Sequence, residues 1–138
     1  MNFASAFAQI NWLSVIVSAI AAFAVGGLWY SPVLFGNVWQ KLIKVSEEEM
    51  KSANMLLIFG STFILNLIGA FVLDMFIGPQ ATLVFGLVAG LIVSIVWVGT
   101  SIAINYLFAR KPFKLFLIDA GYFVTFYALM GIILGAWK

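Results

Sequence analysis

The chain alternates long uncharged stretches with short charged connections. No charged side chain occurs in residues 1–40 or 75–109, and each run exceeds the roughly 20 apolar residues that span a bilayer core. Two further uncharged runs cover residues 52–73 and 120–137. The pattern predicts four transmembrane helices, at about residues 11–30, 54–77, 81–108 and 114–137.

Composition agrees with this pattern and sets the fold class. Hydrophobic residues make up 64% of the 138 residues and charged residues only 9%, whereas about a quarter of the residues in a soluble domain are charged. The links after the second and third spans are short, which makes successive spans antiparallel neighbours. We therefore expect an all-α membrane protein, a bundle of four transmembrane helices forming a single domain over residues 1–138.

A short amphipathic helix is expected directly after the first span, in residues 32–44. Asn37, Gln40, Lys41 and Lys44 recur there at helical spacing on one side, and the opposite side is apolar. Such a helix would lie in the membrane interface. An irregular loop broken at Gly36 is the alternative.

The segment "SEEEM" predicts the start of another helix. Ser46 and Glu49 have the spacing of a capping box, and three carboxylates would sit at the positive end of the helix dipole. The acidic run could also bind a cation, but a capped helix start in water is the favoured interpretation. We expect this helix to continue into the second span.

Basic residues are distributed unequally between the two sides of the expected bundle. Six lie around the first and third connections, at Lys41, Lys44, Lys51, Arg110, Lys111 and Lys114. The other side has only Lys138. The positive-inside rule then predicts a multi-pass protein of the cell inner (plasma) membrane with both termini outside. The first run lacks a basic start and a convincing cleavage site, so no cleaved signal peptide is expected.

The absence of cysteine and histidine restricts the available chemistry. Disulfides, thiolate or imidazole metal sites and nucleophiles paired with histidine are all excluded. The net charge of +2 is too small and scattered for a nucleic-acid surface. Asp74 and Asp119 are expected near opposite leaflets, where they cannot form a catalytic pair. We therefore expect no enzyme activity, no cofactor, no metal and no nucleic-acid partner.

Asp119 is the carboxylate that needs an explanation, because it lies in an otherwise apolar run. Counting from the third connection places Asn105 at a similar depth, with Ser101 and Tyr122 one turn further in and Tyr30 in the same leaflet. Asp119 could pair with a cationic side chain from elsewhere in the fold, stay protonated, or face water. We expect a hydrogen bond to Asn105 and a carboxyl group that is protonated for much of its time. The group could serve as a proton relay or as a pin between helices, with the pin favoured.

Small residues recur at four-residue spacing on three spans, which favours close helix packing within one chain or between chains. Because these residues line more spans than one four-helix bundle needs to bury, we expect the protein to form a homo-oligomer in the lipid bilayer. They are Ser18, Ala22 and Gly26, then Gly86 and Gly90, then Gly131 and Gly135. Sliding the chain by 73 positions also produces matches, such as Val25 and Gly26 with Val98 and Gly99. Such internal similarity is what the duplication of an ancestral unit of two spans would leave.

Two stretches, "NWLSVIVSAIAAFAVGGLWYSPVLFGNVW" and "LIDAGYFVTFYALMGIILGAW", resemble the bacterial family catalogued as domain of unknown function number 1761. The resemblance covers nearly the whole chain. Its most specific residues are Trp29, Tyr30, Ser31, Pro32, Phe35, Gly36 and Trp39 in the first stretch, and Asp119, Gly121, Tyr122, Gly131 and Gly135 in the second. It implies a small integral membrane protein of about four helices and supplies no activity.

Two functions remain open at this point. The first is a carrier or channel for a small solute or ion, which could be proton-coupled and would be assembled from several copies, because four helices enclose little interior. Its site would be the cluster of Asn105, Asp119 and Tyr122. The alternative is a non-catalytic scaffold or accessory subunit of another membrane protein, in which that cluster is structural.

Overall fold

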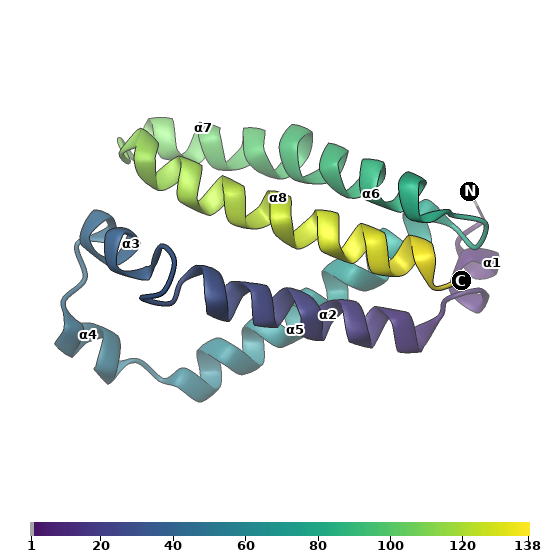
Figure 1. Cartoon of the computed structure of the whole chain (residues 1–138), viewed down its shortest axis with the longest axis horizontal. Helices are drawn as coiled ribbons and strands as arrows, with labels where there is room; N and C mark the ends of the chain where they lie inside the picture. Colours follow the sequence, from purple (N-terminus) through teal and green to yellow (C-terminus); the bar gives the residue numbers. More distant parts are fainter. Residues whose placement is uncertain (1) are drawn as a thin grey trace.

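The structure is a computed structural model that describes residues 2–138. This part of the chain is helical and contains no strand (Figure 1). Its elements are α1 (Phe3–Ala8), α2 (Trp12–Trp29), α3 (Gly36–Ile43), α4 (Glu47–Ser52), α5 (Met55–Ile77), α6 (Leu83–Ile92), the π-helix η1 (Val93–Gly99), α7 (Thr100–Phe108) and α8 (Phe113–Ala136).

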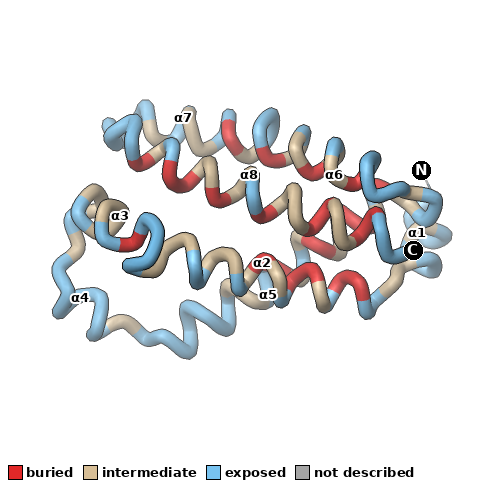
Figure 2. The backbone as a smooth tube through the Cα atoms, viewed as in Figure 1, coloured by how far each residue is buried: buried red, intermediate tan, exposed pale blue. Residues whose placement is uncertain are grey.

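Four rods in this structure are long and apolar enough to cross a membrane, which confirms the predicted fold class. They are α2, α5, the continuous rod formed by α6, η1 and α7, and α8. Helix α8 lies between the α6–α7 rod and α2, as Figure 1 shows. Its buried residues Phe126, Met130 and Leu134 belong to the core, which Figure 2 marks in red along the facing sides of the helices.

Helix α5 packs on α2 through aromatic side chains. Trp12 stacks on Phe71 with 5.6 Å between ring centroids, and Phe23 meets Phe59 edge-on at 5.7 Å. In the first turns of α5, residues 55–61, Phe59 packs on Phe23, but every residue is exposed. Helix α5 therefore belongs to the bundle mainly through its second half.

Glycines bring α6 and α8 into backbone contact. A Cβ added to Gly86 would lie 2.0 Å from the carbonyl oxygen of Gly131, and one added to Gly90 would lie 2.1 Å from that of Tyr127. A Cβ added to Gly135 would lie 2.4 Å from the carbonyl oxygen of Thr82. Any larger residue would force the two helices apart, so these glycines serve packing within one chain.

The π-helix η1 changes which side of the third span faces inward. Gly86, Gly90 and Ser94 are buried at a spacing of four residues, and the next buried residue, Gly99, follows after five. A π-turn closes i to i+5 and takes about one residue more than an α-turn, which rotates everything after it by about 100°. The hydroxyl of Ser101 donates to the Trp97 carbonyl at 2.7 Å, within this wider turn.

The amphipathic helix is present, but it begins at Gly36 rather than near Pro32. Residues 31–35 form turns in which the Phe35 N–H donates to the Trp29 carbonyl at 3.0 Å and the Gly36 N–H to the Ser31 carbonyl at 2.9 Å. A Cβ on Gly36 would lie 2.3 Å from the Tyr30 carbonyl oxygen, so this turn requires glycine. The alternative of an irregular loop therefore describes residues 31–35, whereas the predicted helix describes the residues from Gly36 to Ile43.

The capping box of α4 is confirmed, because the Ser46 hydroxyl accepts from the Glu49 N–H and the Glu49 carboxylate accepts from the Ser46 N–H. The expected continuation into the second span is wrong. Helix α4 ends at Ser52, and the Asn54 side chain accepts from the Leu57 N–H to cap a separate helix, α5. Helix α1 was not predicted; the Asn2 side chain caps it by accepting from the Ala4 N–H.

Candidate functional site

Two tyrosines hold the carboxylate of Asp119. The Tyr30 hydroxyl donates to Oδ1 at 2.6 Å, and the Tyr106 hydroxyl donates to Oδ2. Tyr30 ends α2, Tyr106 lies on α7 and Asp119 on α8, so one side chain links three helices. We call these three residues the Asp119 cluster. Its carboxylate is only 9% exposed, which makes each of these bonds hard for water to replace.

The predicted hydrogen bond between Asp119 and Asn105 is wrong. Asn105 is exposed and makes no side-chain hydrogen bond within residues 2–138, and the Ser101 hydroxyl is bonded to its own helix. Ser101 follows the buried Ser94 after seven residues and Asn105 follows after four more, so a regular helix would have kept both on the face that meets α8. Because η1 rotates the rod, Tyr106 comes inward in their place.

Tyr122 joins the site by packing and makes no hydrogen bond to Asp119. Its ring meets that of Tyr30 edge-on, with 5.3 Å between centroids. Gly26 leaves room for it, since a Cβ there would lie 3.1 Å from the Tyr122 hydroxyl oxygen. Tyr122 therefore fixes the ring whose hydroxyl reaches the carboxylate.

Two tryptophans, at the end of α2 and on α3, pack beside the Asp119 cluster. Trp29 Nε1 donates to the Ile118 carbonyl at 3.0 Å, and the Trp29 ring covers Gly121, where a Cβ would lie only 3.1 Å away. Trp39 on α3 meets Tyr30 at 5.1 Å between ring centroids. The two stretches that carry the family resemblance thus meet in space and build one structure around Asp119.

The carboxyl group of Asp119 has no cationic partner among the described residues. The one ion pair in residues 2–138 joins Lys138 and Asp74, so no described cation lies within 4 Å of Asp119. Each phenol has a single proton, and neither hydroxyl has another acceptor in the described chain. The two phenols occupy both carboxyl oxygens, and the expectation that Asp119 is protonated for much of its time stays a prediction.

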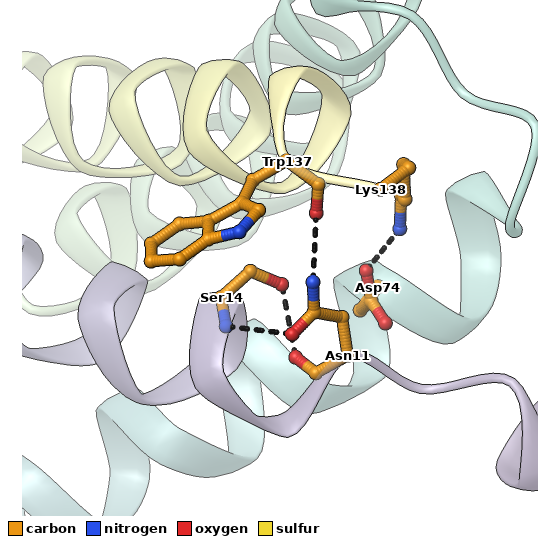
Figure 3. A network of polar contacts seen from close by, with 5 residues as sticks. All are labelled: Asn11, Ser14, Asp74, Trp137 and Lys138. Atoms are coloured by element: carbon orange, nitrogen blue, oxygen red, sulfur yellow. Dashed lines mark hydrogen bonds and ion pairs between the residues drawn. The ribbon is translucent and has the colours of Figure 1, made fainter.

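A second polar network closes the opposite end of α8 (Figure 3). The Lys138 ammonium donates to Asp74, which is 3% exposed, and Asn11 Nδ2 donates to the Trp137 carbonyl at 3.1 Å. Asn11 Oδ1 also accepts from the Ser14 N–H at 3.2 Å. Sequence reasoning placed Asp74 near the leaflet opposite Asp119 but missed the pair with Lys138, although Lys138 is the only basic residue expected on that side.

Neither network forms a metal site within the described residues, and the Asp119 cluster lines neither of two cavities, one beside α3 and one beside Asp74. No group of three Asp or Glu side chains in the described residues is placed to hold a metal ion. A cavity of about 390 Å³ lies beside α3 and the start of α4, and one of about 10 Å³ lies beside Asp74. No residue of the Asp119 cluster lines either of them. The arrangement can bind helices together and, through the phenols, could exchange a proton.

Comparison with curated proteins and with solved structures returned no match for this chain. One family model matches, described as "Protein of unknown function (DUF1761)", over residues 13–135. The match includes all four long rods except the first residue of α2 and the last of α8. This chain therefore belongs to the DUF1761 family of proteins of unknown function.

Proposed function

We propose that this protein is a non-catalytic scaffold or accessory subunit of another membrane protein. The observation that carries this proposal is the closure of the Asp119 cluster, in which two other helices occupy both carboxylate oxygens. A group held in this way joins helices and is not free to bind a solute. The ion pair of Asp74 and the glycine contacts of α6 and α8 add to a rigid bundle.

The exposed first turns of α5, residues 55–61, are the surface we propose for contact with the larger protein. Leu56 is 85% exposed and Leu57 is 64% exposed. Gly60, with nothing within 4 Å of an added Cβ, would let another helix approach closely. Phe59 packs on Phe23 of α2, but all residues of the segment stay exposed.

Photo-crosslinking in the native membrane tests the scaffold proposal. A photoreactive residue replaces Leu56, and the matched control replaces Leu107, which is 77% exposed on α7 at the same end of the bundle. We expect one dominant adduct with a different membrane protein from position 56 and none from position 107. Adducts with lipid alone at both positions would refute the proposal, and an adduct with a second copy of this chain would favour the carrier instead.

A carrier or channel assembled from several copies is the second candidate. It is favoured by one observation, namely that Asp119 has neutral phenol partners and no counterion, so a proton could pass along the cluster. Proton flux into liposomes, followed with an enclosed pH-sensitive dye, tests it. Flux in the wild type that disappears in a folded Asp119→Asn variant would support the carrier; equal leakage in the two would eliminate it.

We further propose that the protein resides in the inner (plasma) membrane with both termini outside. The six basic residues of the first and third connections all lie at the end of the bundle formed by α3, α4 and the α7–α8 turn (Figure 1). Lys138 lies at the opposite end, beside the N-terminal helix. The positive-inside rule assigns the basic end to the cytoplasm.

A further inference from the structure

The cavity beside α3 is a hollow with a defined wall. Asn37, Lys41 and Lys44 line it from one side of α3, at positions i, i+4 and i+7. Lys44 ends the helix in the left-handed conformation, with φ of 58°. This bend brings the chain back over the helix, where Gln40 Nε2 donates to the Val45 carbonyl at 3.3 Å. The volume of about 390 Å³ lies within the range of about 300–1,000 Å³ that is usual for small-ligand pockets.

The hollow carries more positive than negative charge. Lys41 and Lys44 have no carboxylate within 4 Å, because the one ion pair of residues 2–138 is at the other end of the bundle. Glu47 also lines the hollow, whereas the Glu49 carboxylate is occupied by the Ser46 N–H. Two unpaired ammonium groups beside the Asn37 amide suit an anion, and lysine binds phosphate as a compact point charge.

The position of α3 sets the height of the hollow relative to the membrane. Trp39 on α3 contacts Tyr30 at the end of α2, so α3 lies where the first rod leaves the apolar region. Trp and Tyr favour the headgroup level, which is also the level of the lipid phosphates. An anion at this height can come from the lipid or from the aqueous side.

We propose that this hollow binds a phosphate group, supplied by a phospholipid headgroup or by a soluble phosphate ester. The ammonium groups of Lys41 and Lys44 hold the phosphate oxygens, and the Asn37 amide adds a neutral donor. Glu47 opposes the anion and limits its affinity. The site is separate from the Asp119 cluster and does not depend on the scaffold function.

Native mass spectrometry of the purified full chain in a neutral detergent tests this site. Dioleoylphosphatidylglycerol is the phosphate-bearing probe, and dioleoylglycerol, which lacks the phosphate, is its control. Lys41→Gln and Lys44→Gln should each weaken retention of the phospholipid about fivefold, the change expected for one lysine near a lipid phosphate. Glu47→Gln should strengthen it. Lys51→Gln is the matched control, since it removes the same charge from the same end of the protein but outside the hollow.

Competition with inorganic phosphate separates the two sources of the ligand. Loss of the bound phospholipid in excess phosphate, with the same dependence on Lys41 and Lys44, supports a soluble phosphate ester. Retention of the phospholipid supports a headgroup. Equal retention of the two lipids overturns the proposal, and so does an effect of Lys51→Gln as large as that of Lys41→Gln. Thermal melting confirms that each variant is folded.

Discussion

Replacing Tyr106 by Phe removes one of the two donors to Asp119 and leaves the ring in place. Hydrogen bonds to charged groups contribute about 1.5–3 kcal/mol in soluble proteins, whereas bonds between membrane helices average about 0.6 and reach about 1.7 kcal/mol. Asp119 is only 9% exposed, so water cannot easily replace the lost donor. We therefore expect Tyr106→Phe to lower the free energy of unfolding by about 1.5 kcal/mol, or about tenfold in the equilibrium constant.

Equilibrium unfolding in mixed detergent micelles, followed by circular dichroism, measures this change. Tyr127→Phe is the matched control, because the Tyr127 hydroxyl makes no hydrogen bond within residues 2–138 and should be nearly neutral when removed. Asn105→Ala should also be nearly neutral, since Asn105 is exposed. The reasoning is refuted if Tyr106→Phe matches the wild type while Asn105→Ala costs 1 kcal/mol or more, roughly the contribution of an ordinary hydrogen bond.

Three further experiments probe the rest of the structure. Gly86→Ala should destabilise the protein by about 1–3 kcal/mol because its Cβ would overlap the backbone of α8, whereas Gly60→Ala, with open space around it, should stabilise α5 slightly; thermal melting compares the two. Lys138→Gln should destabilise by about 2 kcal/mol, below the usual cost of stranding a fully buried charge, as measured by the same micelle unfolding. Single cysteines at Gln40 and Gln80 report orientation: an impermeant maleimide applied to intact cells should label position 80 only, and labelling of position 40 alone would invert the topology.

The four rods follow from the sequence because a bilayer imposes a length and excludes charge. Both constraints are visible in the uncharged runs, and no tertiary information is needed to apply them. The turn before α3 was not predictable in the same way. Pro32 is compatible with a helix start, and only the contact of Gly36 with the Tyr30 carbonyl shows that the chain first folds back on α2.

The composition of the Asp119 cluster was only partly predictable, for a geometric reason. Depth along a helix can be counted from a connection, and the count correctly placed Tyr30 and Asp119 in the same layer. Direction around the helix depends on every intervening turn being regular. The π-turn at η1 adds about one residue to that count, and it moves Tyr106 into the position assigned to Asn105. The internal duplication that the matches at an offset of 73 residues indicate stays a prediction.

The glycine contacts also change what can be said about assembly. Self-association was expected because small residues lined more spans than one bundle seemed to need. Gly86, Gly90, Gly131 and Gly135 are all used where α6 meets α8, and Gly26 accommodates Tyr122. Ser18 and Ala22 are fully buried on α2. Only Gly27 and Gly60 have open space around them, among the helical glycines, so a second helix that packs by close backbone approach would have to use α2 or α5 there. A carrier whose copies pack in this way would use those faces, and the crosslinking experiment at Leu56 examines one of them directly.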